Sequence, residues 1–215
     1  MSAHQVRIAL SPARTSTYLF AQKTFPPCLD KALMLYRWNV ELSGAMYWNL
    51  ATCEVVVRNA VDDALSVVYG ADWPWSTTFI FDLNAEGKAG LQKAKQIAGA
   101  SASTGKVVAE LHFGFWEKMF KASFDTSVWN GQIHRVFPQL TNPNVQVARA
   151  DIAAKLKMIR NLRNRIAHHE PLIHMHVQPV LDTVQRLVKL RCLDTASWIA
   201  GTSTVASVLA KRPKV

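Results

Sequence analysis

The chain has 215 residues, of which 49% are hydrophobic and 19% charged, so it can bury a core and is not composed like a disordered chain. Its net charge of +10 favours a polyanionic partner, because clustered Lys and Arg release counterions from phosphates. A solvated basic surface would carry the same charge. The three cysteines, Cys28, Cys53 and Cys192, form no CxxC pattern, which predicts reduced thiols in a cytoplasmic protein and excludes a disulfide framework.

The start of the chain lacks a basic region followed by a sustained apolar run, so no signal peptide is predicted. The longest apolar stretch, residues 196–210, is interrupted by polar residues and falls short of the roughly 18 apolar residues that a membrane span needs. We therefore expect no membrane partner. Residues 1–27 show little periodicity and end in Pro26 and Pro27, which predicts a loosely ordered N-terminal arm.

Beyond this arm, apolar residues recur at helical spacing. A first helix is predicted from Cys28 to Leu42, and Ser43 is expected to cap a second helix that reaches Tyr69. Trp73 and Trp75 follow and are expected to close the end of the core. Further helices are predicted over residues 86–100, 106–123, 144–169, 180–190 and 198–209, with a short helix before Pro138 and a flexible loop over 99–105.

Alternation with a period of two residues is scarce throughout, so the predicted fold class is all-α, a helical bundle. We expect three parts along the chain. These are the arm over residues 1–27, a helical domain over residues 28–178, and C-terminal helices with a basic tail over residues 179–215.

The most informative segment is Arg163-Asn164-Arg165-Ile166-Ala167-His168, which His169, Glu170 and Pro171 follow. On a helix, Arg163 falls in the apolar stripe that Leu156, Ile159 and Ile166 form. A guanidinium beside a core face is unfavourable unless it is paired, so a compensating group is expected. Asn164 and His168 are four residues apart and share a face, with Arg160 one turn earlier.

These residue types suit the cleavage of RNA without a metal. Arg163 can stabilise the extra negative charge of a phosphorane-like transition state, His168 can act as acid or base, and Asn164 can orient the imidazole or a phosphate oxygen. Ribose supplies its own nucleophile, the 2′-hydroxyl. His169 is a second candidate imidazole. The structural alternative is that Arg163 extends its charge into solvent while His168 and His169 only close a helix end.

Arg-x4-His with Asn after the arginine resembles the signature of HEPN-domain ribonucleases. The longer run over residues 159–171 resembles the Abi-like, or abortive-infection, branch of that superfamily. Two further segments are similar, residues 47–59 and the stretch that contains Phe113-Gly114-Phe115-Trp116, Trp129 and Phe137-Pro138. The similarity covers about residues 29–172, in the family's order.

The resemblance implies a HEPN-like bundle over residues 28–178 that forms a homodimer with a composite active site. It implies a metal-independent endoribonuclease without a cofactor, leaving 2′,3′-cyclic phosphate and 5′-hydroxyl ends. It further implies a toxin or an antiviral defence protein, held silent by an antitoxin or inhibitor protein. By position, Arg163, Asn164 and His168 match the catalytic motif. Glu170 stands where some HEPN toxins carry a tyrosine that a nucleotidyltransferase antitoxin modifies, so that form of silencing is not expected.

Glu54 and Arg58 lie one turn apart, just off the apolar stripe of the second predicted helix. We predict that Glu54 pairs with Arg163 and supplies the compensating charge. The alternative is a local ion pair between Glu54 and Arg58, which would contribute little.

Two other functions compete with RNA cleavage. His168, His169, Glu170, His174 and His176 are a dense set of possible metal ligands, but Pro171 breaks their helical register and no known template fits, so no metal site is predicted. The second alternative is a non-catalytic RNA-binding or dimerisation module, whose phosphate contacts would come from Lys155, Lys157, Arg160, Arg165, Arg186, Lys189 and Arg191. Phosphate-loop, dinucleotide-binding and nucleophile-elbow motifs are absent from the sequence.

Overall fold

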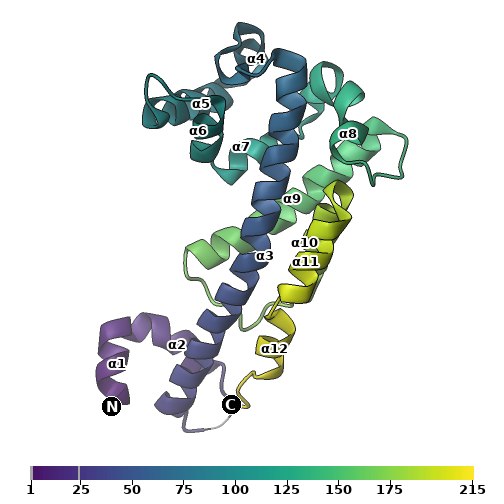
Figure 1. Ribbon diagram of the computed structural model, residues 1–215. Helices are drawn as coiled ribbons and strands as arrows, with labels where there is room; N and C mark the ends of the chain where they lie inside the picture. The colour runs from purple at the N-terminus through teal and green to yellow at the C-terminus, as the bar shows by residue number, and fades with distance from the viewer. Residues whose placement is uncertain (1, 24) are drawn as a thin grey trace.

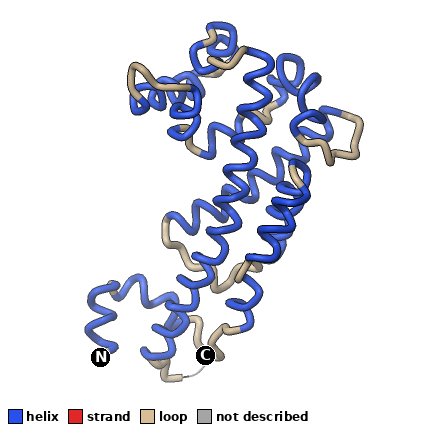
Figure 2. Tube along the Cα trace, in the orientation of Figure 1, coloured by secondary structure: helices blue, strands red, loops and turns tan. Residues whose placement is uncertain are grey.

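The computed structural model describes residues 2–23 and 25–215, and every regular element within these ranges is helical (Figures 1 and 2). The predicted all-α fold class is therefore confirmed. The α-helices are α1 (Ala3–Leu10), α2 (Pro12–Phe20), α3 (Leu29–Tyr69), α4 (Thr77–Asp82), α5 (Ala85–Ala98), α6 (Thr104–Glu110), α7 (Phe113–Lys118), α8 (Asn130–Val136), α9 (Val145–Ala167), α10 (Gln178–Arg191), α11 (Leu193–Thr202) and α12 (Val205–Ala210). Three short turns complete them, η1 (Trp73–Trp75), η2 (Ala122–Phe124) and the π-helical η3 (Asp125–Trp129).

Helix α3 is the axis of the molecule and spans 41 residues (Figure 1). The sequence predicts two helices that meet at Ser43, and this prediction is wrong. The Ser43 hydroxyl donates to the Asn39 carbonyl one turn back, at 2.9 Å, instead of capping a new helix. The continuous helix lets one element carry both the core contacts and the candidate site.

The other helices are arranged along α3. Helices α4 to α8 gather around its C-terminal end, α9 and α10 pack against its middle, and α1, α2 and α12 lie at its N-terminal end (Figure 1). At the C-terminal end, Trp73 is fully buried and donates from its indole nitrogen to Asp62, at 2.7 Å. Trp75 is 41% exposed, so only one of the two tryptophans closes the core as predicted.

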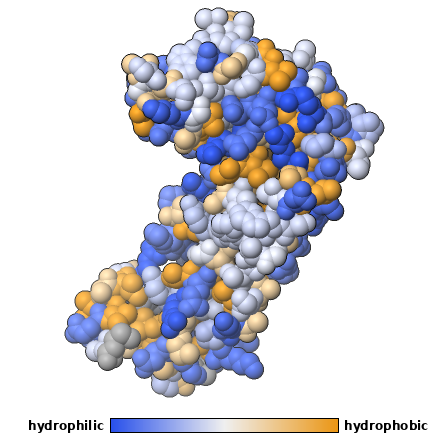
Figure 3. Space-filling model, in the orientation of Figure 1, coloured by the Kyte–Doolittle hydropathy of each residue, from blue (hydrophilic) through white to orange (hydrophobic). Residues whose placement is uncertain are grey.

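The N-terminal segment differs from the loosely ordered arm that the sequence predicts over residues 1–27. Its described residues form α1 and α2, and Tyr18 is buried against Tyr36 in an edge-to-face contact, with ring centroids 5.3 Å apart. The Ser11 side chain accepts from the Arg14 backbone N–H and Pro12 opens α2, which is a favourable helix start. Both helices are too short to show clear periodicity in the sequence. Apolar residues gather on this end of the surface (Figure 3).

Two predicted helices are each broken in two. The helix expected over residues 106–123 separates into α6 and α7, because His112 Nδ1 accepts from the Phe115 backbone N–H and starts a new helix. The helix expected over residues 198–209 separates into α11 and α12, with Ser203 and Thr204 between them. Among residues 2–23 and 25–215, no helix combines the length and the hydrophobicity that a membrane-spanning segment requires.

The start of α9 is fixed by a largely buried ion pair. Arg149 binds Asp125 of η3 through two hydrogen bonds, Nε to Oδ1 at 2.8 Å and Nη2 to Oδ2 at 3.0 Å. Both side chains are less than 15% exposed. This contact sets the position from which α9 crosses α3 towards the candidate site.

Candidate functional site at the junction of three helices

Helix α9 carries the Arg-Asn-His segment at its C-terminal end. Its N-terminus is capped by Asn144, whose side chain accepts from the Val147 backbone N–H at 2.9 Å. The buried stripe of α9 passes through Ile159 and then Leu162, so Arg163 lies at the edge of the apolar face and not within it. The Arg163 side chain is 38% exposed. Its guanidinium is therefore open to solvent on one side and to the body of the protein on the other.

The predicted contact between Glu54 of α3 and Arg163 is present. Glu54 Oε2 lies 3.9 Å from Arg163 Nε, which is a charge contact too long for a hydrogen bond. Burial raises the pKa of Glu54 above its ordinary value, and it outweighs the lowering by Arg163, Arg58 and His112. The carboxylate is thus held in a partly desolvated position among three cationic or protonatable groups.

Arg58 lies one turn beyond Glu54 on α3, but no carboxylate of the described chain lies within 4 Å of its side chain. The local Glu54–Arg58 ion pair is therefore not what the structure contains. The Nε–H of Arg58 is buried without a hydrogen-bond partner among the described residues. A buried guanidinium donor without a partner is unfavourable, so the Nε–H of Arg58 is a cost to the fold.

A second carboxylate joins the same helix to α7. Arg160 lies one turn before Arg163 on α9, and its Nη1 atom is 2.9 Å from Glu117 Oε2. The geometry of this ion pair is unsuitable for a hydrogen bond. At the start of α7, His112 is close enough to Glu54 to lower its pKa. Helices α3, α7 and α9 therefore meet through a set of ionisable groups, which we call the three-helix junction: Glu54, Arg58, His112, Glu117, Arg160 and Arg163.

The side chains of Asn164, His168 and His169 form no hydrogen bond or ion pair with the residues of this junction. His168 forms the C-cap of α9, where its backbone N–H donates to the Asn164 carbonyl at 2.9 Å. His169 follows with a φ of +55°, which turns the chain away from the helix. All three side chains are exposed and make no hydrogen bond or ion pair within the described chain. A single chain thus assembles the arginines and leaves the imidazoles accessible.

The turn that carries the histidines is nevertheless fixed on both sides. The buried Asn39 side chain of α3 accepts from the Leu172 backbone N–H, with Oδ1 and N 2.6 Å apart. Arg14 of α2 donates from Nη1 to the His169 carbonyl at 2.6 Å. Arg165 pairs with Glu170 at 3.4 Å and donates to the Pro171 carbonyl. In Figure 1, the end of α9 extends past α3 and the following loop returns to it.

The residues that the sequence offered for a metal site or for phosphate contacts are not gathered into one site. In the ranges that the structure describes, no three His, Cys, Asp or Glu side chains gather in a way that would hold a metal ion. Several of the basic residues proposed for phosphate contacts have structural partners, since Lys155 pairs with Asp151 and Arg191 pairs with Asp63. Lys157, Arg186 and Lys189 have no such carboxylate within 4 Å in the described chain.

No protein-family description, no curated protein and no solved structure matches this chain. The resemblance to Abi-like HEPN ribonucleases therefore rests on the residues of the chain alone, and it remains a prediction.

Proposed function

We propose that this protein is a metal-independent endoribonuclease whose catalytic residues are Arg163, Asn164 and His168, as its resemblance to Abi-like HEPN ribonucleases implies. The observation that carries the proposal is the state of Arg163. Its guanidinium is part-exposed, is kept near Glu54 by charge, and makes no hydrogen bond within the described chain. Its N–H donors therefore remain free for the oxygens of a phosphate.

The proposed reaction uses the RNA's own nucleophile. The ribose 2′-hydroxyl attacks the adjacent phosphorus while an imidazole removes its proton, and the P–O5′ bond breaks as the leaving oxygen gains a proton. The products are a 2′,3′-cyclic phosphate and a 5′-hydroxyl. In this scheme His168 transfers a proton, Arg163 binds a non-bridging oxygen as negative charge builds up, and Asn164 orients the phosphate. Arg58 and Arg160 add positive potential, and His169 is a further candidate for proton transfer.

A homodimer with a composite site is part of the proposal. Tyr47 lies two helical turns before Glu54 on the same side of α3, and Val40 lies two turns before Tyr47. Both are more than half exposed, at 56% and 51%, so an apolar row leads along α3 to the three-helix junction. A second copy on this row would bring the exposed His168 side chains near a neighbouring junction. We place the enzyme in the cytoplasm, in antiviral defence or as a toxin, with an inhibitor protein as its regulator.

A second candidate function is a non-catalytic RNA-binding or dimerisation module. One observation favours it: within the described residues, the side chains of Asn164 and His168 make no hydrogen bond with Arg163. Such a module would bind RNA and leave it intact.

The test is incubation of total cellular RNA with the purified protein in the presence of a chelator. We expect fragmentation by the wild type, and a rate at least about 100-fold lower for Arg163→Ala and for His168→Ala. Arg37→Ala and His174→Ala are matched controls, because both residues are exposed and lie outside the junction. RNA that the wild type binds but leaves uncut would support the non-catalytic binding module and contradict the proposed nuclease activity.

A further inference from the structure

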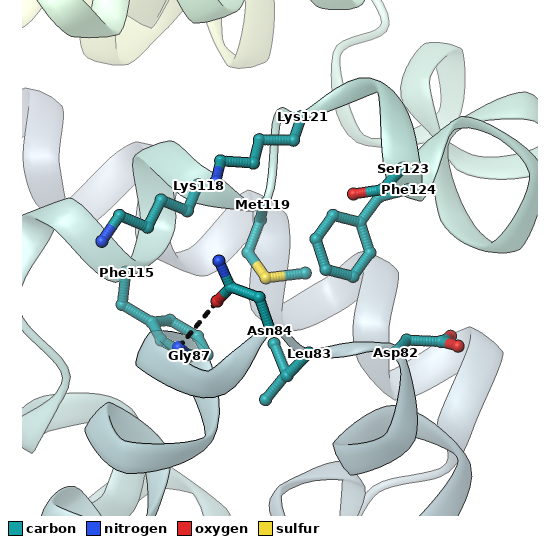
Figure 4. Close-up of a pocket in the computed structure, with 10 residues that line it drawn as sticks. All are labelled: Asp82, Leu83, Asn84, Gly87, Phe115, Lys118, Met119, Lys121, Ser123 and Phe124. Carbon is teal, nitrogen blue, oxygen red and sulfur yellow. Dashed lines mark hydrogen bonds between the residues drawn. The ribbon is translucent and has the colours of Figure 1, made fainter.

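A cavity of about 300 Å³ lies beside the three-helix junction, between the α4–α5 connection and the segment from α7 to η2 (Figure 4). This volume is at the small end of the range for ligand sites. Leu83, Phe115, Met119 and Phe124 form an apolar interior, and all four are buried in the fold. Polar groups stand around it: Asp82, Asn84, Lys118, Lys121 and Ser123. Such a cavity suits a flat apolar ring with polar edges.

Asn84 places an unused donor in this cavity. Its side-chain oxygen accepts from the Gly87 backbone N–H at 2.9 Å and caps α5, which assigns the amide nitrogen to the opposite side. In Figure 4, this nitrogen points away from α5 towards the Lys118 side of the cavity. It makes no hydrogen bond within the described chain. An NH₂ group here can donate to a carbonyl oxygen at the edge of a ring.

The charges around the cavity are arranged by sign. Lys118 forms an ion pair with Glu86, and both Lys118 and Lys121 hold the pKa of Glu86 below its ordinary value. Lys121 has no carboxylate within 4 Å in the described chain. Asp82, the acidic group of the lining, accepts a hydrogen bond from the Tyr69 hydroxyl at 2.7 Å. An anionic ligand group is therefore expected on the Lys121 side.

A second hollow lies between the segment that carries Lys118 and Lys121 and helix α9. It has a volume of about 260 Å³ and is lined by Lys118, Lys121 and Lys157, together with Glu117, Phe120, Ala153 and Ala154. Lys118 and Lys121 line both hollows. On α9, Lys157, Arg160 and Arg163 follow at steps of three residues, so they lie along one side of the helix within about 9 Å of axial rise. Basic side chains thus follow one another from the second hollow to Arg163, and the middle one, Arg160, is paired with Glu117.

We propose that this cavity is a base-binding subsite for single-stranded RNA, next to the position at which the strand is cut. A nucleobase inserts among Phe115, Met119 and Phe124, while Lys121 and Lys157 bind the phosphates between this base and Arg163. The Asn84 donor selects bases that present a carbonyl oxygen there, so uracil is preferred to adenine. The inference rests on the proposed function, since it takes RNA as the ligand.

The test measures the binding of fluorescent hexamers of uridine and of adenosine by anisotropy, in the His168→Ala protein with chelator, so that the RNA stays intact. We expect the uridine hexamer to bind at least about tenfold more tightly. Asn84→Asp keeps the helix cap but exchanges the donor for an acceptor, so the preference should shift towards adenosine. A general repulsion by the new charge would weaken both hexamers equally and leave the preference unchanged, which would overturn the subsite.

Lys121→Met should weaken both hexamers and reduce the salt dependence of binding, because one phosphate contact is lost. Lys93→Met, an exposed lysine of α5 outside both hollows, is the control and should change neither quantity. Binding that is indifferent to Asn84 and Lys121 would contradict the proposal even if the wild type cuts RNA. If the wild type cuts no RNA but the expected preference for uridine is measured, the base-binding subsite is supported and the proposed nuclease activity is contradicted. Tighter binding of uridine monophosphate than of the hexamer would also overturn the RNA subsite.

Discussion

The carboxylate of Glu54 on α3 and the guanidinium of Arg163 on α9 lie 3.9 Å apart. This contact joins two helices whose residues are more than one hundred positions apart in the chain. It holds the arginine by charge without consuming its hydrogen-bond donors, and burial keeps the pKa of Glu54 above its ordinary value. The contact therefore leaves the N–H donors of Arg163 free for a ligand and contributes little to the stability of the fold.

Glu54 should make the stability of the protein depend on pH. Because the folded state raises the pKa of Glu54, the folded protein holds this proton more tightly than the unfolded chain does. The free energy of unfolding of the wild type, relative to Glu54→Gln, should be largest below pH 4.5 and should decrease as the pH rises through the raised pKa. Urea unfolding of both proteins from pH 4 to pH 8 measures this difference. A relative gain of the wild type with rising pH would show that attraction to Arg163 outweighs burial. Identical stability at every pH, with identical RNA cleavage, would contradict the pairing.

The Arg149–Asp125 pair should be a major contribution to stability. Arg149→Met leaves the carboxylate of Asp125 largely buried without its two hydrogen bonds, and it should lower the free energy of unfolding by about 3 kcal/mol. The matched control is Arg37→Met, since Arg37 pairs with Glu41 on the surface and should contribute less than about 0.5 kcal/mol. Chemical denaturation at neutral pH compares them. Equal effects of the two substitutions would contradict a specific role for the buried pair.

Asn39 should hold the turn after the histidines. Asn39→Ala removes the acceptor of the buried Leu172 N–H, with an expected cost of about 2 kcal/mol. Hydrogen exchange should become faster at Leu172, and RNA cleavage should slow because His168 loses its fixed position. Asn59→Ala is the control, as Asn59 is exposed on the same helix and makes no hydrogen bond. Unchanged protection of Leu172 in the Asn39 variant would exclude this anchoring role.

The exposed apolar row on α3 should mediate dimer formation. Tyr47 is 56% exposed in the single chain and lies in this row between Val40 and the three-helix junction. Tyr47→Lys places a charge there, so it should produce monomers without loss of helix content. Sedimentation velocity measures the mass, and circular dichroism controls for folding. Val67→Lys, at an exposed apolar position on the opposite end of α3, should leave the mass unchanged. A wild type that is monomeric at high concentration would contradict the composite site.

The longer helices could be predicted from the sequence because their apolar periodicity is strong. Helices α5, α9 and α10 begin and end within a few residues of their predicted limits. The errors arose where a local signal had two structural uses. Serine is a common N-cap residue, but the Ser43 hydroxyl donates to a carbonyl of the same helix, α3. His112 caps a new helix at a point where the apolar pattern of the sequence continues without a break. The short helices α1 and α2 give too few turns for a pattern to emerge.

The Glu54–Arg163 contact could also be predicted, because an arginine at a position of the predicted apolar stripe requires a counter-charge. The rest of the junction could not. Asn39 and Leu172 are 133 residues apart, and only the tertiary fold brings them together. The signal in the sequence was that a polar residue, Asn39, stands on the apolar face of α3, where it is buried and needs a hydrogen-bond partner. Glu117, His112 and the Asn84 cavity depend on how α7 packs against α3 and α9, which no local pattern specifies.

The most direct test of the proposed chemistry uses an RNA oligonucleotide that the wild type cuts at one site. The same oligonucleotide is then made with a single 2′-deoxyribose on the 5′ side of that bond. In chelator, we predict that the all-ribose strand yields a 2′,3′-cyclic phosphate and that the substituted strand is not cut there, because its nucleophile is missing. Cleavage of the deoxy-substituted bond at an undiminished rate would contradict attack by the 2′-hydroxyl and, with it, the roles given to Arg163 and His168.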